Sequence, residues 1–351
     1  MSTLQAAAQA VQAKKTARVA VIGAAGYSGG EFARLALEHP GIALEALVVR
    51  SRESEAARDV GSALPGVDGR AVAVPLLEVE DLKAKLAQGD VDTIVAALPH
   101  GTWKRLLEDS AWLAGAARVI DLSSDHRDGS AGYVYGLPEA FREEIAAAER
   151  VANPGCYPTA AALALLPAAA RGWIDGPVTV SAVSGVSGAG RGAKLKTSFV
   201  EVDGNASFYE VGTTHAHVAE MARTLARAGA PVEVAFAPAL VPMARGILLT
   251  AQAKLARPVS AQEAHEAYAA RYGDEPFVRL LEPGAWPSTA AVKGSNRVDV
   301  QVTTLFGGTT LLATAAIDNL AKGAASQALQ NLNLMTGWPE TTGLSRHGRP
   351  W

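Results

Sequence analysis

The sequence predicts an α/β protein in two parts: a doubly wound parallel sheet, then an α+β part with a mostly antiparallel sheet. Between residues 18 and 155, short β-branched runs alternate with helical patterns, which is typical of a parallel sheet covered by helices. Beyond residue 156, longer runs of alternating polarity are separated by glycine-rich turns, which favours antiparallel strands. The length of 351 residues also favours two domains over one.

The composition is that of an ordinary globular protein, with 49% hydrophobic residues, 19% charged residues and a net charge of −3. It lacks the positive excess of nucleic-acid-binding proteins, and no apolar run approaches the ~20 residues of a membrane helix. The single cysteine excludes an intrachain disulfide and fits a reducing compartment. We therefore expect a cytoplasmic protein without nucleic-acid or membrane partners. Residues 1–16, which lack the apolar core of a signal peptide, are expected to form a frayed extension.

A glycine loop follows the first predicted strand, residues 18–22, and precedes a helix expected from about residue 30 to 38. Its glycines stand as G-x-x-G-x-x-G, which allows a tight turn and close approach of a pyrophosphate to the helix N-terminus. An ordinary strand-to-helix turn is the alternative. The context favours a Rossmann-type dinucleotide site with contacts from Gly23, Ala25, Gly26, Tyr27, Ser28 and Gly29.

The ends of later strands predict the rest of this site. The strand at 44–49 leads into Arg50, Ser51 and Arg52, where an acidic residue would hold the ribose of NAD. Arginine and serine instead favour a 2′-phosphate, hence NADP(H), although a solvated loop is the alternative. Because ligands of open sheets bind at the carboxyl ends of strands, the candidates also include Pro99, His100 and Ser123.

Cys156 lies in a polar turn, residues 153–159, that precedes an Ala/Leu-rich run. Pro158 suits the first turn of a helix, so Cys156 is expected just before a helix N-terminus, where the dipole favours a thiolate. A small buried hydrophobe is the alternative for a free cysteine. The setting favours a nucleophile.

Two basic sites are predicted in the second part. A glycine loop after the strand at 178–186 contains Ser187 and Gly188, which are candidate cofactor contacts, and Arg191 and Lys194, which suit an anion. A flexible hairpin with solvated charges explains this loop equally well. Arg245 lies in an apolar turn between two expected antiparallel strands, at 232–236 and 246–253. A guanidinium there can bind a substrate carboxylate, and a structural ion pair is the alternative.

A pair of histidines, His215 and His217, follows two threonines that are expected to cap a helix. Glu220 is three residues after His217, so on a helix its carboxylate can orient that imidazole. The alternative is a capping or core histidine. No further His/Cys cluster accompanies the pair, so no metal is expected. A hairpin at 298–316 and a helix at 318–331 that returns to the first domain complete the expected elements.

Four motifs together resemble N-acetyl-γ-glutamyl-phosphate reductases of arginine biosynthesis, relatives of aspartate-semialdehyde dehydrogenases, over about residues 17–338. They are G-x-x-G-Y-S-G at 23–29, N-P-G-C-Y-P-T at 153–159, S-G-V-S-G-A-G-R at 184–191 and D-N-L-x-K-G-A-A-x-Q-A at 318–328. The last motif implies that Asn319 approaches the nicotinamide. One departure stands out, because the family usually has H-R-H-T-P-E where residues 215–220 read H-A-H-V-A-E. The choice of base between His215 and His217 stays open, with Glu220 favouring His217.

The resemblance implies NADPH-dependent reduction of N-acetylglutamyl 5-phosphate to the semialdehyde, with release of phosphate, through a Cys156 thioester and with His217 as acid–base. Arg191 and Lys194 then contact phosphate or substrate, and Arg245 the α-carboxylate. Residues 17–155 plus 319–351 would bind NADP, and residues 156–318 would hold the catalytic and oligomerisation surfaces of a homotetramer or homodimer. The alternatives are the same chemistry on a carrier-protein-bound aminoadipyl phosphate of lysine biosynthesis, and a non-catalytic NADP-binding regulator.

Overall fold

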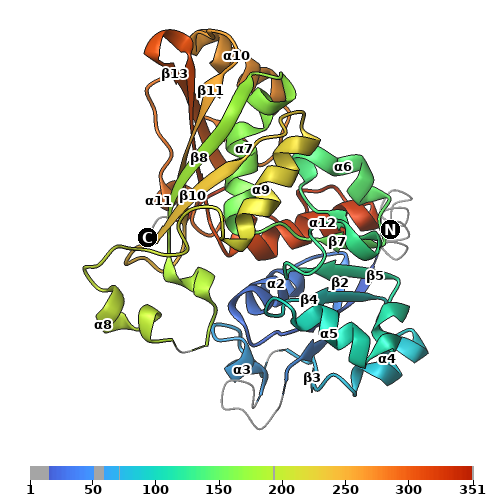
Figure 1. Ribbon diagram of the computed structural model, residues 1–351. Helices are drawn as coiled ribbons and strands as arrows, with labels where there is room; N and C mark the ends of the chain where they lie inside the picture. The colour runs from blue at the N-terminus through green and yellow to red at the C-terminus, as the bar shows by residue number, and fades with distance from the viewer. Residues whose placement is uncertain (1–15, 51–58, 71, 193, 350–351) are drawn as a thin grey trace, which may run out of the picture. The chain divides into compact units, whose positions relative to one another are not determined.

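The computed structural model describes residues 16–50, 59–70, 72–192 and 194–349, which form two compact units (Figure 1). The first unit extends to Pro154 and includes Ala325–Leu344, and the second contains Gly155–Ala324 and the segment from Ser345 onward. Apart from Thr16, the expected N-terminal extension lies outside the described residues.

The units differ from the expected domains near the C-terminus, because residues 319–324 and the segment after Leu344 belong to the second unit. Hydrogen bonds explain this difference. The Asp318 carboxylate accepts from the Gly294 N–H at 2.7 Å, and the Arg349 N–H donates to the Lys293 carbonyl at 2.7 Å. The residue just before 319–324 and the segment after Leu344 are therefore each hydrogen-bonded to second-unit residues.

The sheet of the first unit has seven parallel strands in the order β3-β2-β1-β4-β5-β7-β6. All neighbouring pairs are parallel, as predicted for this half. The order reverses between β1 and β4, which marks the ligand-binding edge of a doubly wound sheet. The strands are β1 Ala17–Ile22, β2 Ile42–Val48, β3 Leu76–Leu77, β4 Thr93–Ala96, β5 Arg118–Asp121, β6 Val134–Tyr135 and β7 Arg150–Ala152.

Helices cover both faces of this sheet. One buried cluster packs Phe32, Leu329 and alternate strand residues together, and a second packs Leu82, Trp103 and the intervening strand residues. The expected returning helix is α12, which begins later than predicted and belongs to the first unit. The helices are α2 Tyr27–Leu37, α3 Val60–Ala63, α4 Leu82–Gln88, α5 Thr102–Asp109, α6 Pro138–Ala146 and α12 Ser326–Thr336, with short 3₁₀ turns at Ala111–Gly115 and Ser130–Gly132.

The sheet of the second unit also has seven strands, in the order β12-β13-β14-β11-β8-β10-β9. It is antiparallel except at β12–β13 and β8–β10, so the prediction of a mostly antiparallel sheet is confirmed. The hairpin of β13 and β14 is confirmed as well. The strands are β8 Ile174–Ser184, β9 Ser207–Phe208, β10 Val234–Leu240, β11 Ile247–Leu255, β12 Val278–Leu280, β13 Val298–Leu305 and β14 Thr310–Ile317.

The two strands expected on either side of Arg245, β10 and β11, run in opposite directions but are not neighbours, because β8 lies between them. The crossover through α9 explains this order, since a helix that connects two strands of one sheet usually sets them parallel. Here it sets β10 parallel to β8.

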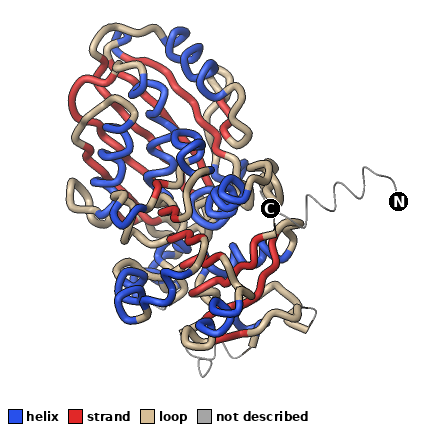
Figure 2. Tube along the Cα trace, turned by 90° about the vertical axis from the view of Figure 1, so that its right-hand side faces the viewer, coloured by secondary structure: helices blue, strands red, loops and turns tan. Residues whose placement is uncertain are grey.

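Helix α7 is the centre of the second unit. Its side chains from Tyr157 to Ala169 are buried, and it packs against the sheet, α9 and α10. Figure 2 shows helices of this unit lying against its strands. β8 and β11 alternate buried and exposed residues, so their second face is open in the single chain. The helices are α7 Cys156–Ala170, α8 Phe199–Val202, α9 Ala216–Arg227, α10 Ala261–Tyr272 and α11 Thr289–Val292, with a π-helical turn at Ala321–Ala325 and 3₁₀ turns at Val186–Ala189, Leu195–Thr197 and Phe306–Gly308. None of the described helices is both long and apolar enough to cross a membrane.

Candidate active site

The glycine loop of the first unit is shaped by two backbone contacts. A Cβ atom on Gly23 would lie 2.3 Å from the Ala97 carbonyl oxygen, and one on Gly29 would lie 2.3 Å from the Gly23 carbonyl oxygen. Gly23 also has a φ of +84°, which side-chain-bearing residues rarely adopt. Gly26 is the N-cap of α2, which begins at Tyr27, three residues earlier than expected. The loop therefore presents a helix N-terminus with no acidic residue in its first turn, which is the geometry that an anion needs.

The other first-unit candidates lie after the neighbouring strands. Arg50 is exposed just beyond β2, and Pro99 and His100 are exposed beyond β4. His100 Nδ1 accepts a hydrogen bond from the Ser124 N–H at 3.1 Å, and this contact joins the β4 and β5 loops. Ser123 is buried, and its hydroxyl accepts from the Asp125 N–H at 3.1 Å. Ser51 and Arg52 lie outside the described residues.

Cys156 is the first residue of α7, whereas we expected it just before the helix. Its side chain is half-buried. The preceding Gly155 is the N-cap, and its N–H donates to Glu220 Oε1 at 2.8 Å. Glu220 is 3% exposed, so its carboxylate is a buried link between α9 and the turn that carries Cys156. The sequence did not predict this contact.

Gly323 is a site residue that the sequence analysis missed. A Cβ atom there would lie 2.7 Å from the Cys156 Cβ, closer than real Cβ contacts allow. A side chain at this position would therefore force the π-helical turn Ala321–Ala325 or Cys156 to shift. The sequence signal that could have identified Gly323 as a site residue was its position inside the D-N-L-x-K-G-A-A motif.

The two histidines have different local roles. His215, rather than the threonines, is the N-cap of α9, and its Nδ1 accepts from the His217 N–H at 3.1 Å. Their ring centroids are 4.9 Å apart. Tyr157, next to Cys156, meets both rings edge-on, with its centroid 5.9 Å from that of His217 and 6.3 Å from that of His215. The structure therefore brings the histidine pair beside the residue that follows the cysteine.

Tyr209 completes this cluster and was also missed. Its hydroxyl is 2.8 Å from the Tyr157 hydroxyl, and its ring centroid is 5.8 Å from that of His215. Burial raises the pKa of Tyr209 to about 12, and the pKa of Tyr157 is raised still further by burial. Both hydroxyls are therefore neutral near pH 7, where they can donate hydrogen bonds.

Asn319 joins two loops near the end of β14. Its Nδ2 donates to the Ser187 hydroxyl at 2.9 Å, and its Oδ1 accepts from the Gly246 N–H at 2.7 Å. Gly185, in the same glycine loop, packs so closely on the Ala244–Arg245 backbone that a Cβ atom would lie 2.8 Å from it. Gly188 is exposed in this loop.

Arg245 forms the ion pair that was the alternative to substrate binding, with 2.9 Å between Nε and Asp318 Oδ2. Asp318 is fully buried, whereas Arg245 is partly exposed. Arg245 also lines a cavity of about 220 Å³ with Met243, Ala244, Thr289, Ala290 and Lys293. This cavity holds two cationic side chains, and Lys293 was not predicted.

The remaining basic candidates lie in the loop after β8. Lys194 is exposed, and its Nζ donates to the Ala189 carbonyl at 2.8 Å, while Arg191 is half-buried. Among the described residues, no group of three or more His, Cys, Asp or Glu side chains could hold a metal ion.

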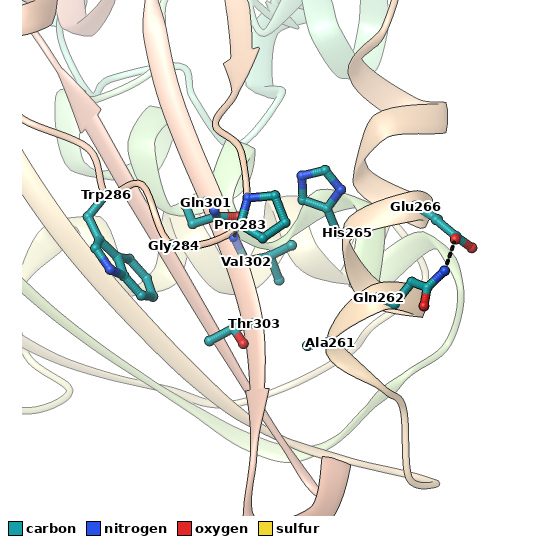
Figure 3. Close-up of a pocket in the computed structure, with 10 residues that line it drawn as sticks. All are labelled: Ala261, Gln262, His265, Glu266, Pro283, Gly284, Trp286, Gln301, Val302 and Thr303. Atoms are coloured by element: carbon teal, nitrogen blue, oxygen red, sulfur yellow. Dashed lines mark hydrogen bonds between the residues drawn. The ribbon is translucent and has the colours of Figure 1, made fainter.

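A larger cavity of about 340 Å³ lies between α10 and β13 (Figure 3). Its polar side chains are engaged with their own neighbours, because Gln262 donates to Glu266 at 2.9 Å and His265 Nε2 lies 3.2 Å from the Leu281 carbonyl. It contains none of the predicted site residues.

Comparison with known proteins agrees with this geometry. Residues 18–148 match the model of the semialdehyde dehydrogenase NAD-binding domain, and residues 156–319 match that of the semialdehyde dehydrogenase dimerisation domain. The second match indicates a homo-oligomer. Among solved structures, aspartate semialdehyde dehydrogenase II of Vibrio cholerae superposes with a TM-score of 0.71 at 20% identity, covering 91% of this chain and 98% of that one. The NADP complex of the Candida albicans aspartate semialdehyde dehydrogenase gives a TM-score of 0.66 at 15% identity, covering 90% and 99%.

Curated relatives are much closer in sequence. The N-acetyl-gamma-glutamyl-phosphate reductase of Streptomyces clavuligerus is 45% identical, covering 95% of this chain and 99% of the relative. The enzyme of the same name from Saccharopolyspora erythraea is 41% identical, covering 94% and 98%. The chain therefore belongs to the N-acetyl-gamma-glutamyl-phosphate reductases of the semialdehyde dehydrogenase family.

Proposed function

We propose that the chain reduces N-acetyl-γ-glutamyl phosphate to N-acetylglutamate 5-semialdehyde with NADPH and releases phosphate, a step of arginine biosynthesis. The observation that carries the proposal is the site around Cys156. A lone cysteine begins a buried helix, its turn is held by Glu220, and the adjacent Tyr157 contacts two histidines. The relatives that cover nearly the whole chain carry the name of this reaction.

The first unit suits a nicotinamide dinucleotide. The close contacts at Gly23 and Gly29 leave backbone rather than side chains around the N-terminus of α2, where a pyrophosphate would accept N–H bonds. Arg50 would pair with a 2′-phosphate, which favours NADP(H) over NAD(H). When bound, the reduced nicotinamide supplies a hydride for the carbonyl carbon of the thioester. The D-N-L-x-K-G-A-A motif implies that Asn319 approaches the nicotinamide, to which the second hydrogen of its Nδ2 could donate.

The thiolate of Cys156 is the nucleophile. The Cys156 sulfur bonds to the acyl carbon, the carbon–oxygen bond to phosphate breaks, and phosphate leaves with both bonding electrons. The N-terminus of α7 favours the thiolate through its dipole and its N–H groups. The resulting thioester is reduced to a thiohemiacetal, which collapses to the aldehyde and returns the thiolate.

We assign the acid–base role to His217. His215 Nδ1 already accepts a hydrogen bond as the cap of α9, so in the neutral ring the proton is on Nε2 and His215 has no nitrogen left to act as a base. His217 lies within α9 beside Tyr157, and it does not serve as the N-cap of the helix. Its imidazole would take the hydroxyl proton of the thiohemiacetal as the aldehyde leaves.

The substrate anions have two candidate sites. The cavity beside Arg245 and Lys293 suits the α-carboxylate, because a partly exposed guanidinium held at Nε by Asp318 is fixed in orientation. Arg191 and Lys194 would meet the phosphate. We further propose a homotetramer or homodimer that acts in the cytoplasm, with the first unit as the NADP-binding domain and the second as the catalytic domain.

The test is the reverse reaction, phosphate-dependent reduction of NADP⁺ with N-acetylglutamate 5-semialdehyde. We expect activity that requires phosphate, exceeds that with NAD⁺ and falls at least about 10³-fold in Cys156→Ala, because the variant has no nucleophile. NADP⁺ binding, measured by fluorescence, should be unchanged in the variant. Retained turnover in Cys156→Ala would refute the thioester route, and wild-type protein that binds NADP⁺ without turnover would refute the proposed substrate.

A further inference from the structure

The segment 194–211, which we call the arm, connects the glycine loop after β8 to the site histidines. It contains the 3₁₀ turn Leu195–Thr197, the four-residue α8 and the two-residue strand β9. β9 pairs with β10 at the edge of the second-unit sheet through only two residue pairs. Figure 1 shows the rest of the arm, with α8, extending away from that sheet.

Exposed large hydrophobic side chains are concentrated in the arm. Nine large hydrophobic side chains are exposed among the described residues, and five of them belong to the arm. Phe199 and Val200 are 80% and 83% exposed. Single exposed hydrophobics are ordinary, but a concentration of them in one short segment marks an interaction surface. The five are Leu195, Phe199, Val200, Phe208 and Val211.

Two observations indicate that a second copy of the chain covers this surface. The arm lies wholly within residues 156–319, which match the family's dimerisation domain. Its exposed charges also change sign along its length, from Lys196 to Glu201 and Asp203. Two such arms related by a two-fold axis place the basic end of one opposite the acidic end of the other, so the surface is complementary to itself.

We infer that the arm is an intersubunit contact, in which it pairs antiparallel with the arm of a second copy and covers Phe199 and Val200. The contact is isologous: Lys196 of each copy faces Glu201 of the other. This contact would give the homo-oligomer a specific surface on a segment that contains Tyr209 and is followed closely by His215.

The first test measures the molar mass of the full-length protein by light scattering. The double variant F199E/V200E should have at most half the mass of the wild type, because two facing arms would each bring two buried carboxylates to the contact. Phe306→Glu is the matched control, since Phe306 is 77% exposed and lies outside the arm, and its mass should equal that of the wild type. A monomeric wild type, or an unchanged mass in the folded double variant, would overturn the inference.

A second test does not depend on disrupting the contact. In a Cys156→Ser background, which has no other cysteine, Val200→Cys should give a crosslinked dimer with a short bis-maleimide, whereas Phe306→Cys should not. Reversing the charges adds a rescue: Lys196→Glu should lower the mass, and K196E/E201K should restore it, because each residue faces the other across the axis. Absence of the crosslink, or no effect of Lys196→Glu on the mass at low salt, contradicts arm pairing.

Discussion

The glycine loop of the first unit and the surroundings of Cys156 in the second are both defined by contacts too close for a side chain, but they are assembled differently. Gly29, in the first turn of α2, packs against Gly23, six residues earlier. Gly323 packs against Cys156, which is 167 positions earlier in the chain, and Glu220 reaches Gly155 over 65 positions. The glycine loop is therefore shaped by residues that are close in sequence, whereas Cys156 is positioned by residues that are far away in sequence. Damage to the loop should stay confined to cofactor binding, and damage around Cys156 should affect the chemistry.

Apart from loss of Cys156 itself, the largest effect should come from the segment that supplies the histidines. His217→Asn should lower kcat by about 10²- to 10⁴-fold, the usual contribution of a general acid–base residue. His215→Asn should lower it much less, because asparagine is a good N-cap and can keep the helix start in place. Steady-state kinetics of both variants, with the Kd for NADP⁺ as control, checks this. A larger loss in His215→Asn would reverse the assignment of the base.

Gly323→Ala should affect chemistry alone. The added methyl group would meet the Cys156 Cβ, and overpacking of this kind costs about 1–3 kcal/mol in stability. Strain of this size that displaces Cys156 from its reactive position would lower kcat roughly 5- to 150-fold. The rate of Cys156 alkylation by iodoacetamide should change as well, while the Kd for NADP⁺ should not. A normal kcat and a normal alkylation rate would mean that the turn at Ala321–Ala325 shifts to accommodate the methyl group without displacing Cys156.

Gly29→Ala is the opposite case and should weaken NADP⁺ binding by about tenfold, through strain between the first turn of α2 and the backbone at Gly23. Alkylation of Cys156 should proceed at the wild-type rate. If Gly29→Ala and Gly323→Ala gave the same pattern, the distinction between a local and an assembled site would be wrong.

The smallest effect concerns the pH profile. Because the pKa of Tyr209 is raised to about 12, its hydroxyl stays protonated below that pH in the folded protein. Tyr209→Phe should therefore leave the inflections of the kcat–pH profile between pH 6 and 10 unchanged, even if kcat itself falls. A lost inflection in that range would show that Tyr209 ionises there.

The sequence was sufficient for the fold class, the family and the local features. The strand, glycine loop and helix at 18–37 follow one another directly, so their order could be predicted, and the hairpin at 298–317 likewise consists of adjacent runs. The place of β8 between β10 and β11 could not be predicted. Strand order depends on where the helical crossover returns to the sheet, and local sequence patterns do not specify that. The Glu220–Gly155 bond, the capping role of His215 and the proximity of Gly323 to Cys156 also depend on long-range packing. The roles of the site residues stay predictions.

The ion pair between Arg245 and Asp318 also constrains how the chain can change over generations. A fully buried aspartate that loses its cationic partner keeps the N–H donors of Gly294, Leu320 and Ala321 but has no countercharge. Removing one partner of a buried ion pair costs up to about 3–5 kcal/mol, a large part of the stability of a typical domain. A lineage that replaced Arg245 first would pass through a poorly folded ancestor, and one that replaced Asp318 first would release the arginine from its fixed orientation. The two positions are therefore locked together, so that selection for a different substrate at this cavity would act more readily on the neighbouring Lys293 or Thr289.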